Sequence, residues 1–371
     1  MEAKVPTNHV RQSNFELLRI IAIILIIAHH IAVHSGFEYP TEVVSVNRIW
    51  VQFLQLGGKI GVDLFVLISG YFLISSDKVK IHRALRLWLQ LFTYSILLYV
   101  VLVVFVKTEP YSTKKLIESL FPLLFSDWWF GKTYFVLYLL HSYVNRLLLS
   151  FSRAQYKRYL ALLLCIWCVI PTFTQHSSDY NNLIWFIVLY SVAGYYKLHG
   201  RNITCKARTL IALSAAVIML TFLSAVLFDV IGTKITFVGK SATWFYEMNM
   251  LPVLLAAVLL FIGFDRIEMK PRRTVNTIAS AAFGVYLIHD NSYSRPFLWE
   301  KVFNTASYSD SKVLIPYTLL LIVVVFVSCT IIELIRKYGF EKHYLKPLEK
   351  LSGKLSSLGN KIAKQKIFDK L

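Results

Sequence analysis

The chain has 371 residues, of which 56% are hydrophobic and only 16% are charged. This composition excludes an ordinary soluble domain, in which about a quarter of the residues are charged and about half are apolar. The formal net charge of +19 does not indicate a nucleic-acid-binding protein, because the basic residues gather in short segments between apolar runs. The composition therefore predicts a protein that crosses a membrane several times.

Apolar runs of about 19 residues, the length that spans a bilayer as a helix, recur along the chain. They predict an all-α integral membrane protein with about ten transmembrane helices. The predicted spans are residues 15–36, 54–76, 87–106, 133–152, 159–175, 183–199, 209–231, 246–264, 276–290 and 313–335.

The basic residues indicate how these spans are oriented. With a cytoplasmic N-terminus, 27 Lys and Arg residues fall in segments on the cytoplasmic side and 8 in segments on the opposite side. Cytoplasmic loops are enriched in basic residues, so both termini are expected to be cytoplasmic. We expect residues 1–335 to form the transmembrane domain and residues 336–371 to form a basic amphipathic tail that lies on membrane lipid.

The first predicted span carries a polar stripe. Arg19 and His30 are eleven residues apart, which on a helix means about 16 Å along the axis and nearly the same face. Glu16 and His34 extend the stripe toward the two ends. Ionisable side chains at membrane depth are costly and therefore mark a functional site.

The second predicted span places Asp63 at about the depth of His30, if the two spans are antiparallel neighbours. A carboxylate beside an imidazole orients the ring and makes it a better base. The two residues therefore predict a general base with its orienting carboxylate. A structural hydrogen bond between two helices is an equally good interpretation of the same spacing.

Basic and aromatic residues mark the two ends of the bundle. Arg83 and Arg86 share one helical face where the third span begins, and together with Arg19 they can hold an anionic ligand such as a phosphorylated cofactor. Trp129 and Tyr134 lie at the outer mouth of the fourth span, where they indicate either an interfacial aromatic belt or a sugar-stacking surface. The sequence has no cluster with metal-ligand spacing, so no metal is expected.

These motifs resemble the membrane-bound acyltransferase 3 family, whose members include bacterial polysaccharide O-acetyltransferases. The resemblance is dense over residues 14–90 and patchy as far as about residue 335. It is carried by Asn14-Phe-Glu16-Leu-Leu-Arg19 with the following His30, by Gly61-Val-Asp63 through Ser69-Gly70-Tyr71, by Arg83 with Arg86, and more weakly by Trp129–Tyr138 and Phe283–His289.

The resemblance implies an O-acetyltransferase of the bacterial plasma membrane. Such an enzyme takes an acyl group, foremost acetyl, from cytoplasmic acyl-CoA and delivers it to a hydroxyl of a cell-surface polysaccharide or its lipid-linked precursor. By resemblance His30 is the catalytic histidine, Arg19 is its partner, and Arg83 and Arg86 contact acyl-CoA.

Two further expectations concern the acceptor side of such an enzyme. Trp129, Tyr134 and His289 are expected to bind the acceptor. Many relatives carry a C-terminal hydrolase-like domain that completes the transfer, and we expect none in this chain. The expected partners of the chain therefore include a separate transfer protein outside the cytoplasm.

A secondary transporter is the alternative interpretation. In that case Arg19, His30, Asp63 and His289 form a proton or substrate pathway through the bundle. A transporter predicts internal repeats with helices broken at corresponding points, and the sequence shows neither feature. The acyltransferase is therefore the favoured hypothesis.

Overall fold

The structure is a computed structural model that describes residues 12–40, 42–174, 181–200, 204–341, 343 and 347. All regular secondary structure in these ranges is helical, as expected for an all-α protein. Of the tail predicted over residues 336–371, all but residues 336–341, 343 and 347 lies outside the described residues.

The helices follow one another with short connections. In chain order they are α1 (Ser13–His34), α2 (Val46–Leu73), α3 (Ile81–Leu98) with η1 (Tyr99–Phe105), α4 (Thr113–Ser119), α5 (Pro122–Phe125), α6 (Trp129–Ser150), α7 (Arg153–Leu164) with η2 (Cys165–Val169) and α8 (Ile170–Thr174), α9 (Asn182–His199), α10 (Ala207–Gly232), α11 (Thr236–Lys240), η4 (Trp244–Tyr246), α12 (Leu251–Asp265), α13 (Arg273–Ala279), α14 (Ala282–His289), α15 (Ser294–Pro296), η5 (Phe297–Val302), η6 (Thr305–Tyr308), α16 (Leu314–Ile335) and η7 (Arg336–Phe340).

Seven helical segments among the described residues are long and apolar enough to cross a membrane. They begin at residues 13, 46, 81, 153, 207, 236 and 314. The other three predicted spans coincide with α6, with α9 and with the broken pair α13–α14. The protein is therefore a polytopic helical membrane protein, while the count of ten crossings and the cytoplasmic side of the termini stay predictions.

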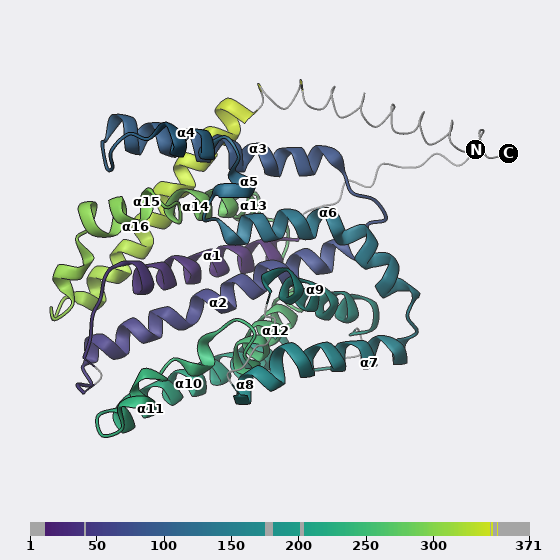
Figure 1. Cartoon of the computed structure of the whole chain (residues 1–371). Helices are drawn as coiled ribbons and strands as arrows, with labels where there is room; N and C mark the ends of the chain where they lie inside the picture. Colours follow the sequence, from purple (N-terminus) through teal and green to yellow (C-terminus); the bar gives the residue numbers. More distant parts are fainter. Residues whose placement is uncertain are drawn as a thin grey trace.

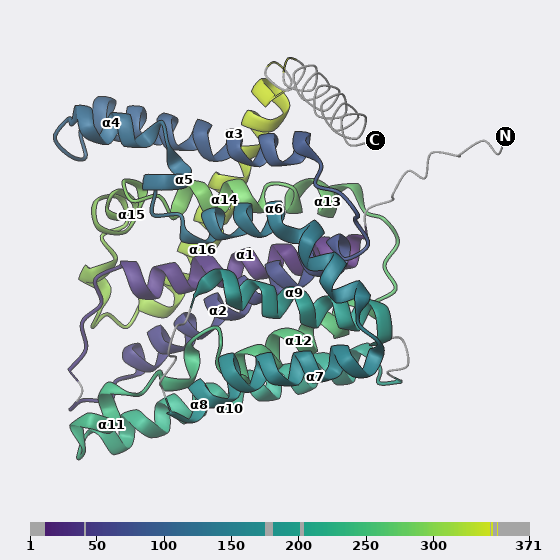
Figure 2. The ribbon, with the colours of Figure 1, turned by 45° about the vertical axis from the view of Figure 1, so that its right-hand side comes forward.

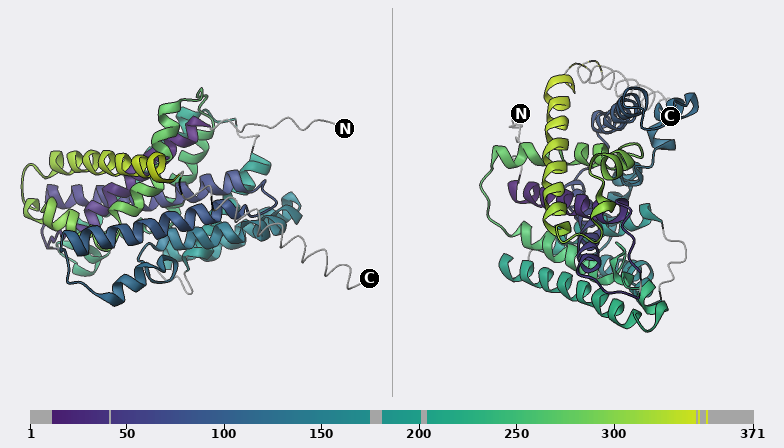
Figure 3. Two further views of the ribbon diagram at one scale, coloured as in Figure 1. Left: turned by 90° about the horizontal axis from the view of Figure 1, so that it is seen from above. Right: turned by 90° about the vertical axis from the view of Figure 1, so that its left-hand side faces the viewer.

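Helix α1 lies at the centre of the bundle, where it packs against α2, α12, α13, α14 and α16. Figures 1 and 2 show α1 and α2 side by side, with α3 and α4 along one edge of the bundle and α10 and α11 along the opposite edge. In the right-hand view of Figure 3, α16 (yellow-green) runs from top to bottom of the picture, while α2 is seen nearly end-on. Helix α16 is therefore strongly tilted against α2.

The contact between α1 and α2 depends on glycines. A Cβ atom added at Gly61 would lie 2.6 Å from the backbone carbonyl oxygen of Ala22, and one added at Gly58 would lie 2.3 Å from Cβ of His29. Small residues allow helices in a membrane to approach closely, where van der Waals packing replaces the hydrophobic effect as the source of stability. The glycines of α2 therefore hold α1 at a fixed position.

We expect Gly61→Ala to destabilise the folded bundle, because the added methyl group meets a backbone oxygen that cannot rotate away. Overpacking of this kind costs about 1–3 kcal/mol, which lowers the midpoint of thermal unfolding in detergent micelles by several degrees. The matched control is Gly339→Ala, since an added Cβ there would meet no described atom within 4 Å. Equal midpoints for the two variants would contradict the packing explanation.

Candidate active site

A chain of hydrogen bonds links His30 on α1 to the backbone of α14. His30 is 9% exposed, and its Nδ1 lies 2.9 Å from Nε2 of His289. Nδ1 of His289 lies 2.5 Å from the carbonyl oxygen of Val285. A carbonyl only accepts hydrogen bonds, so His289 Nδ1 donates, and in a neutral ring His289 Nε2 is then an acceptor.

This chain assigns the proton on His30. His30 Nδ1 must donate to His289 Nε2, which leaves the second ring nitrogen of a neutral His30, Nε2, without a proton and with a free lone pair. His30 also lines a cavity of about 460 Å³. The arrangement can therefore place a base at the wall of that cavity.

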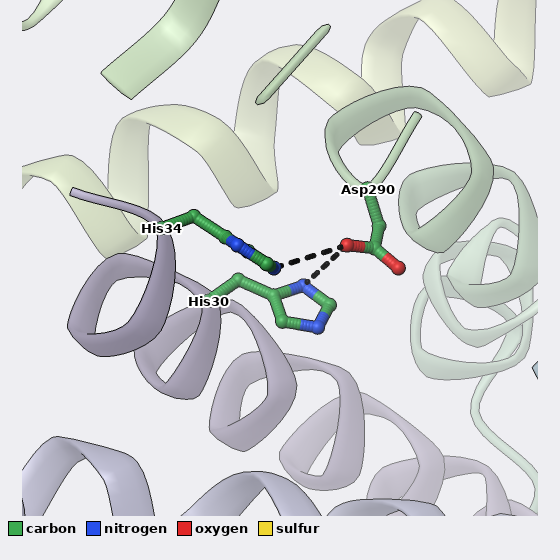
Figure 4. A group of neighbouring side chains, drawn as sticks. All are labelled: His30, His34 and Asp290. Carbon is green, nitrogen blue, oxygen red and sulfur yellow. Dashed lines mark ion pairs between the residues drawn. The ribbon is translucent and has the colours of Figure 1, made fainter. Parts of the chain in front are cut away.

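A carboxylate lies beside the same histidine. Figure 4 shows His30 and His34, one turn apart on α1, facing Asp290 at the end of α14. Asp290 Oδ1 lies 3.5 Å from His30 Nδ1 and 3.7 Å from His34 Nε2. Asp290 is 1% exposed, so solvent screens little of the electrostatic interaction between its carboxyl group and the two imidazole rings.

Arg295 holds Asp290 in place. Its Nε donates to Asp290 Oδ1 over 2.8 Å. Burial lowers the pKa of Arg295, but the hydrogen bond to Asp290 and the attraction of its charge raise it further, so the pKa lies above the ordinary value of a guanidinium. The hydrogen bond from Arg295 therefore gives the buried carboxyl group of Asp290 the charged partner that such a group requires.

His30, His34 and Asp290 each offer one possible metal ligand, and these three atoms lie within 4.8 Å of one another. No spacing along the chain indicated this group, because Asp290 is remote from the two histidines in sequence. Arg295 already supplies a positive charge to the Asp290 oxygen. We therefore interpret the group as one that moves and stabilises a proton, and assign no metal to it.

The three predicted arginines line the same cavity as His30. Arg19 pairs with Glu16 over 2.6 Å, and Arg86 pairs with Glu341 over 3.1 Å. Arg83 has no ion pair with any described carboxylate. A cation without a carboxylate partner at a cavity wall is suited to an anionic ligand.

Buried polar contacts fix the helices around the arginine end of the cavity. Glu333 on α16 is 1% exposed and accepts hydrogen bonds from Gln90 and Tyr94 of α3 and from Arg336. A Cβ added at Gly284 of α14 would lie 2.4 Å from Glu333 Cδ. Helices α3, α14 and α16 therefore meet at one carboxylate, which sets the width of the cavity between them.

The aromatic residues predicted to bind the acceptor are divided between two places. Trp129 and Tyr134 line the cavity together with His30. The hydroxyl of Tyr134 accepts a hydrogen bond from Ser69 Oγ over 3.2 Å. His289 lies behind His30 as its hydrogen-bond partner, so the geometry gives it a positioning role in place of the predicted contact with the acceptor.

The expected pairing of Asp63 with His30 is wrong. Asp63 is fully buried, and its Oδ1 accepts a hydrogen bond from Nε1 of Trp185 on α9 over 3.0 Å. Gly61 faces α1, and a residue two positions later on a helix points about 200° away. Helices α1 and α2 do lie side by side, but the position of a residue along a span gives no information on the direction of its side chain. The carboxyl group near His30 is that of Asp290.

Two charged residues of the site, Asp290 and Arg295, were not found from the sequence. They follow His289 in the segment His289-Asp290-Asn-Ser-Tyr-Ser-Arg295, where Asp290 is the last residue of the predicted span 276–290 and Arg295 lies beyond it. An adjacent histidine and aspartate with an arginine five residues later is by itself a weak indication of a functional site. Asp290 and Arg295 belong to the site only because α14 contacts α1, and spacing along the chain does not reveal that contact.

Comparison with known proteins gave one match. The model of the acyltransferase 3 family, described as an acyltransferase domain, matches residues 12–334 and thus most of the chain. No curated protein and no solved structure matches the chain.

The hydrogen-bond chain predicts that His30 carries its proton on Nδ1. We expect ¹⁵N NMR of histidine-labelled protein in nanodiscs to show this tautomer, with the His30 signals identified by their loss in His30→Asn. His289→Phe removes the acceptor but keeps a ring, and should shift the His30 proton toward Nε2. His141→Phe, which removes another buried histidine bound to a carbonyl, should leave the His30 signals unchanged; an Nε2 proton in the unaltered protein would contradict the assignment.

Proposed function

The chain belongs to the acyltransferase 3 family, and from this premise we propose that it is an O-acetyltransferase of the bacterial plasma membrane. It takes the acyl group of acetyl-CoA or another acyl-CoA on the cytoplasmic side. It delivers that group to a hydroxyl of a cell-envelope polysaccharide, or of its lipid-linked precursor, on the opposite side. The family supports acyl transfer in general, and the donor, the acceptor and the sidedness are part of the proposal.

One observation carries the proposal: a single cavity is lined both by the three arginines and by His30. Arg19 and His30 are separated by about 16 Å along α1. That separation is comparable to the reach of the extended pantetheine arm of CoA. A donor whose phosphates bind Arg19, Arg83 and Arg86 can therefore present its thioester to His30.

The reaction that suits this site is direct transfer. Nε2 of His30 removes the proton of the acceptor hydroxyl while the hydroxyl oxygen attacks the thioester carbonyl carbon. The carbon–oxygen bond of the new ester forms, and the carbon–sulfur bond to CoA breaks. The departing thiolate of CoA takes up the proton from the His30 imidazolium, so protons and charge balance over the cycle.

The residues around His30 assist this proton transfer from a distance. When Nε2 gains a proton, Nδ1–H still donates to His289, and the charge of Asp290 lies 3.5 Å from Nδ1. Such a fixed negative charge in a buried site stabilises the imidazolium without the cost of reorienting solvent. His289 and Asp290 are thus positioning residues, and His30 is the catalytic residue.

The acceptor reaches the cavity from the side where Trp129 and Tyr134 lie. Aromatic faces stack on sugar rings, and the hydroxyl of Tyr134 offers a hydrogen bond beside them. Membrane lipid surrounds the apolar outer faces of the helices, so a lipid-linked sugar can approach within the bilayer. A separate protein outside the cytoplasm can receive the acyl group if the final polymer is the acceptor.

His30→Gln is expected to abolish acyl transfer. The assay uses protein in proteoliposomes with acetyl-labelled acetyl-CoA and extracted envelope glycans, and it measures free CoA and labelled glycan separately. General base catalysis contributes about 10²–10⁴-fold, so both products should fall by at least about a hundredfold. His29→Gln is the matched control, because the neighbouring His29 binds the carbonyl of Gln55 and faces α2.

The outcomes of this assay separate the two hypotheses. Loss of both products in His30→Gln, with near-normal rates in His29→Gln, supports the acyltransferase. If the unaltered protein and His29→Gln both released no CoA with any acyl donor or acceptor, the result would instead favour a transporter. A stable acetyl group recovered on His30 would contradict direct transfer and support a two-step route through acyl-histidine.

Arg83→Gln is expected to weaken donor binding more than catalysis. A charge-assisted hydrogen bond contributes about 1.5–3 kcal/mol, so KM for acetyl-CoA should rise about tenfold or more while kcat changes little. Arg153→Gln removes a positive charge from another predicted cytoplasmic loop and should leave KM unchanged. A fall in kcat at constant KM would contradict the assignment of Arg83 to the donor.

A further inference from the structure

A second cavity adjoins the arginine end of the first. It has a volume of about 380 Å³ and lies between α13 and η7. Ser280 and Lys337 line both cavities, so the two cavities lie next to each other at these residues. A ligand that extends past Lys337 would reach from one cavity to the other.

The described wall of the second cavity has cations but no carboxylate. Arg273 lines it and has no ion pair with any described carboxylate. Lys337 lies at the junction, and its Nζ is 5.9 Å from the ring centroid of Tyr338. This wall favours an anion, and its charge lies outside the apolar part of the bundle, where phosphate groups keep access to water.

The same wall offers contacts for a nucleoside. Tyr338 is 52% exposed and presents an aromatic ring on which a base can stack. Thr277 adds a hydroxyl group to this wall that can bind ribose or the edge of the base, beside Asn276, whose Oδ1 accepts a hydrogen bond from Ser13 Oγ. A phosphate site, an aromatic ring and hydrogen-bonding groups in one cavity match a phosphorylated nucleoside better than a simple anion.

We infer that the cavity lined by Arg273 and Tyr338 binds the 3′-phosphoadenosine end of the acyl-CoA donor. This inference rests on the proposed function. It assigns a separate site to each part of the donor: the thioester lies near His30, the diphosphate near Arg83 and Arg86, and the nucleoside beyond Lys337. Arg273 binds the 3′-phosphate and Tyr338 stacks on the adenine.

The order of these sites follows the order of groups along CoA. In that molecule the pantetheine arm lies between the thioester and the diphosphate, and the 3′-phosphoadenosine follows the diphosphate. The first cavity joins His30 to the arginines, and the second continues from Lys337 to Arg273. In the inferred arrangement the donor lies across the two cavities with its nucleoside at Arg273 and its acyl group at His30.

The test compares acetyl-CoA with acetyl-dephospho-CoA, which lacks only the 3′-phosphate. Arg273→Gln should raise KM for acetyl-CoA about tenfold and leave KM for acetyl-dephospho-CoA and kcat for both donors unchanged. Arg272→Gln is the matched control. Arg272 is the exposed neighbour of Arg273 and does not line this cavity, and its substitution removes the same positive charge. It should change KM for neither donor.

A second pair of variants tests the adenine contact. Tyr338→Ala should raise KM about fivefold for both donors, since both contain adenine and stacking contributes about 1–3 kcal/mol per base. Tyr338→Phe keeps the ring and should restore the KM of the unaltered protein. S-acetylpantetheine, which has no nucleotide, should respond to none of these substitutions.

A direct binding measurement separates this inference from the proposed function. Adenosine 3′,5′-bisphosphate is the probe, and its dissociation constant is measured with protein in nanodiscs made only of zwitterionic lipid. Weaker binding in Arg273→Gln but not in Arg272→Gln supports the nucleotide site, even if no acyl transfer is found. Equal effects of the two arginine variants on binding of the probe, as long-range electrostatic attraction would produce, overturn the inference. An equal rise of KM for both donors in Arg273→Gln also overturns it.

Discussion

The hydrogen bond between His30 and His289 is the interaction on which the site depends. It joins α1 to α14 and assigns the proton of His30 to Nδ1, so that Nε2 is left as a base at the cavity wall. The carbonyl of Val285 anchors His289 in turn. If either helix shifted by the width of one side chain, the proton assignment and the access of His30 to the cavity would be lost together.

The rest of the bundle keeps these two helices in register. The glycines of α2 allow the backbone of α1 to come close, and Glu333 ties α3, α14 and α16 around the arginine end of the cavity. At the opposite end of the cavity, the ion pair between Asp290 and Arg295 compensates the charges of both side chains. Charges at membrane depth are thus confined to contacts that satisfy them, which limits their cost to folding.

This arrangement offers a physical route for moving an acyl group across a membrane. A donor with several phosphate charges cannot enter an apolar bundle, but its uncharged pantetheine arm and acyl group can. In the proposed function the arginines bind the phosphates at one end of the cavity, which is also lined by His30. In the proposed function only the acyl group crosses, and the bilayer remains closed to the rest of the donor.

The sequence predicted the helices and one face of the site well. Helical periodicity placed Arg19 and His30 on the same side of α1, and the structure confirms that both line one cavity. It did not reveal the direction of Asp63, because the depth of a residue in a span says nothing about the neighbouring helix it faces. Asp290 was missed for a related reason: its contact with His30 joins residues about 260 positions apart, and no local pattern encodes that contact.

The central claim is that one cavity holds the donor with its acyl group at His30. The most direct test is a structure of the protein with a thioether analogue of acetyl-CoA, which cannot transfer its acyl group. The analogue is predicted to lie with its phosphates at Arg83 and Arg86 and its carbonyl beside Nε2 of His30. An analogue bound with its carbonyl outside the cavity, or with His30 turned away from it, would contradict the claim.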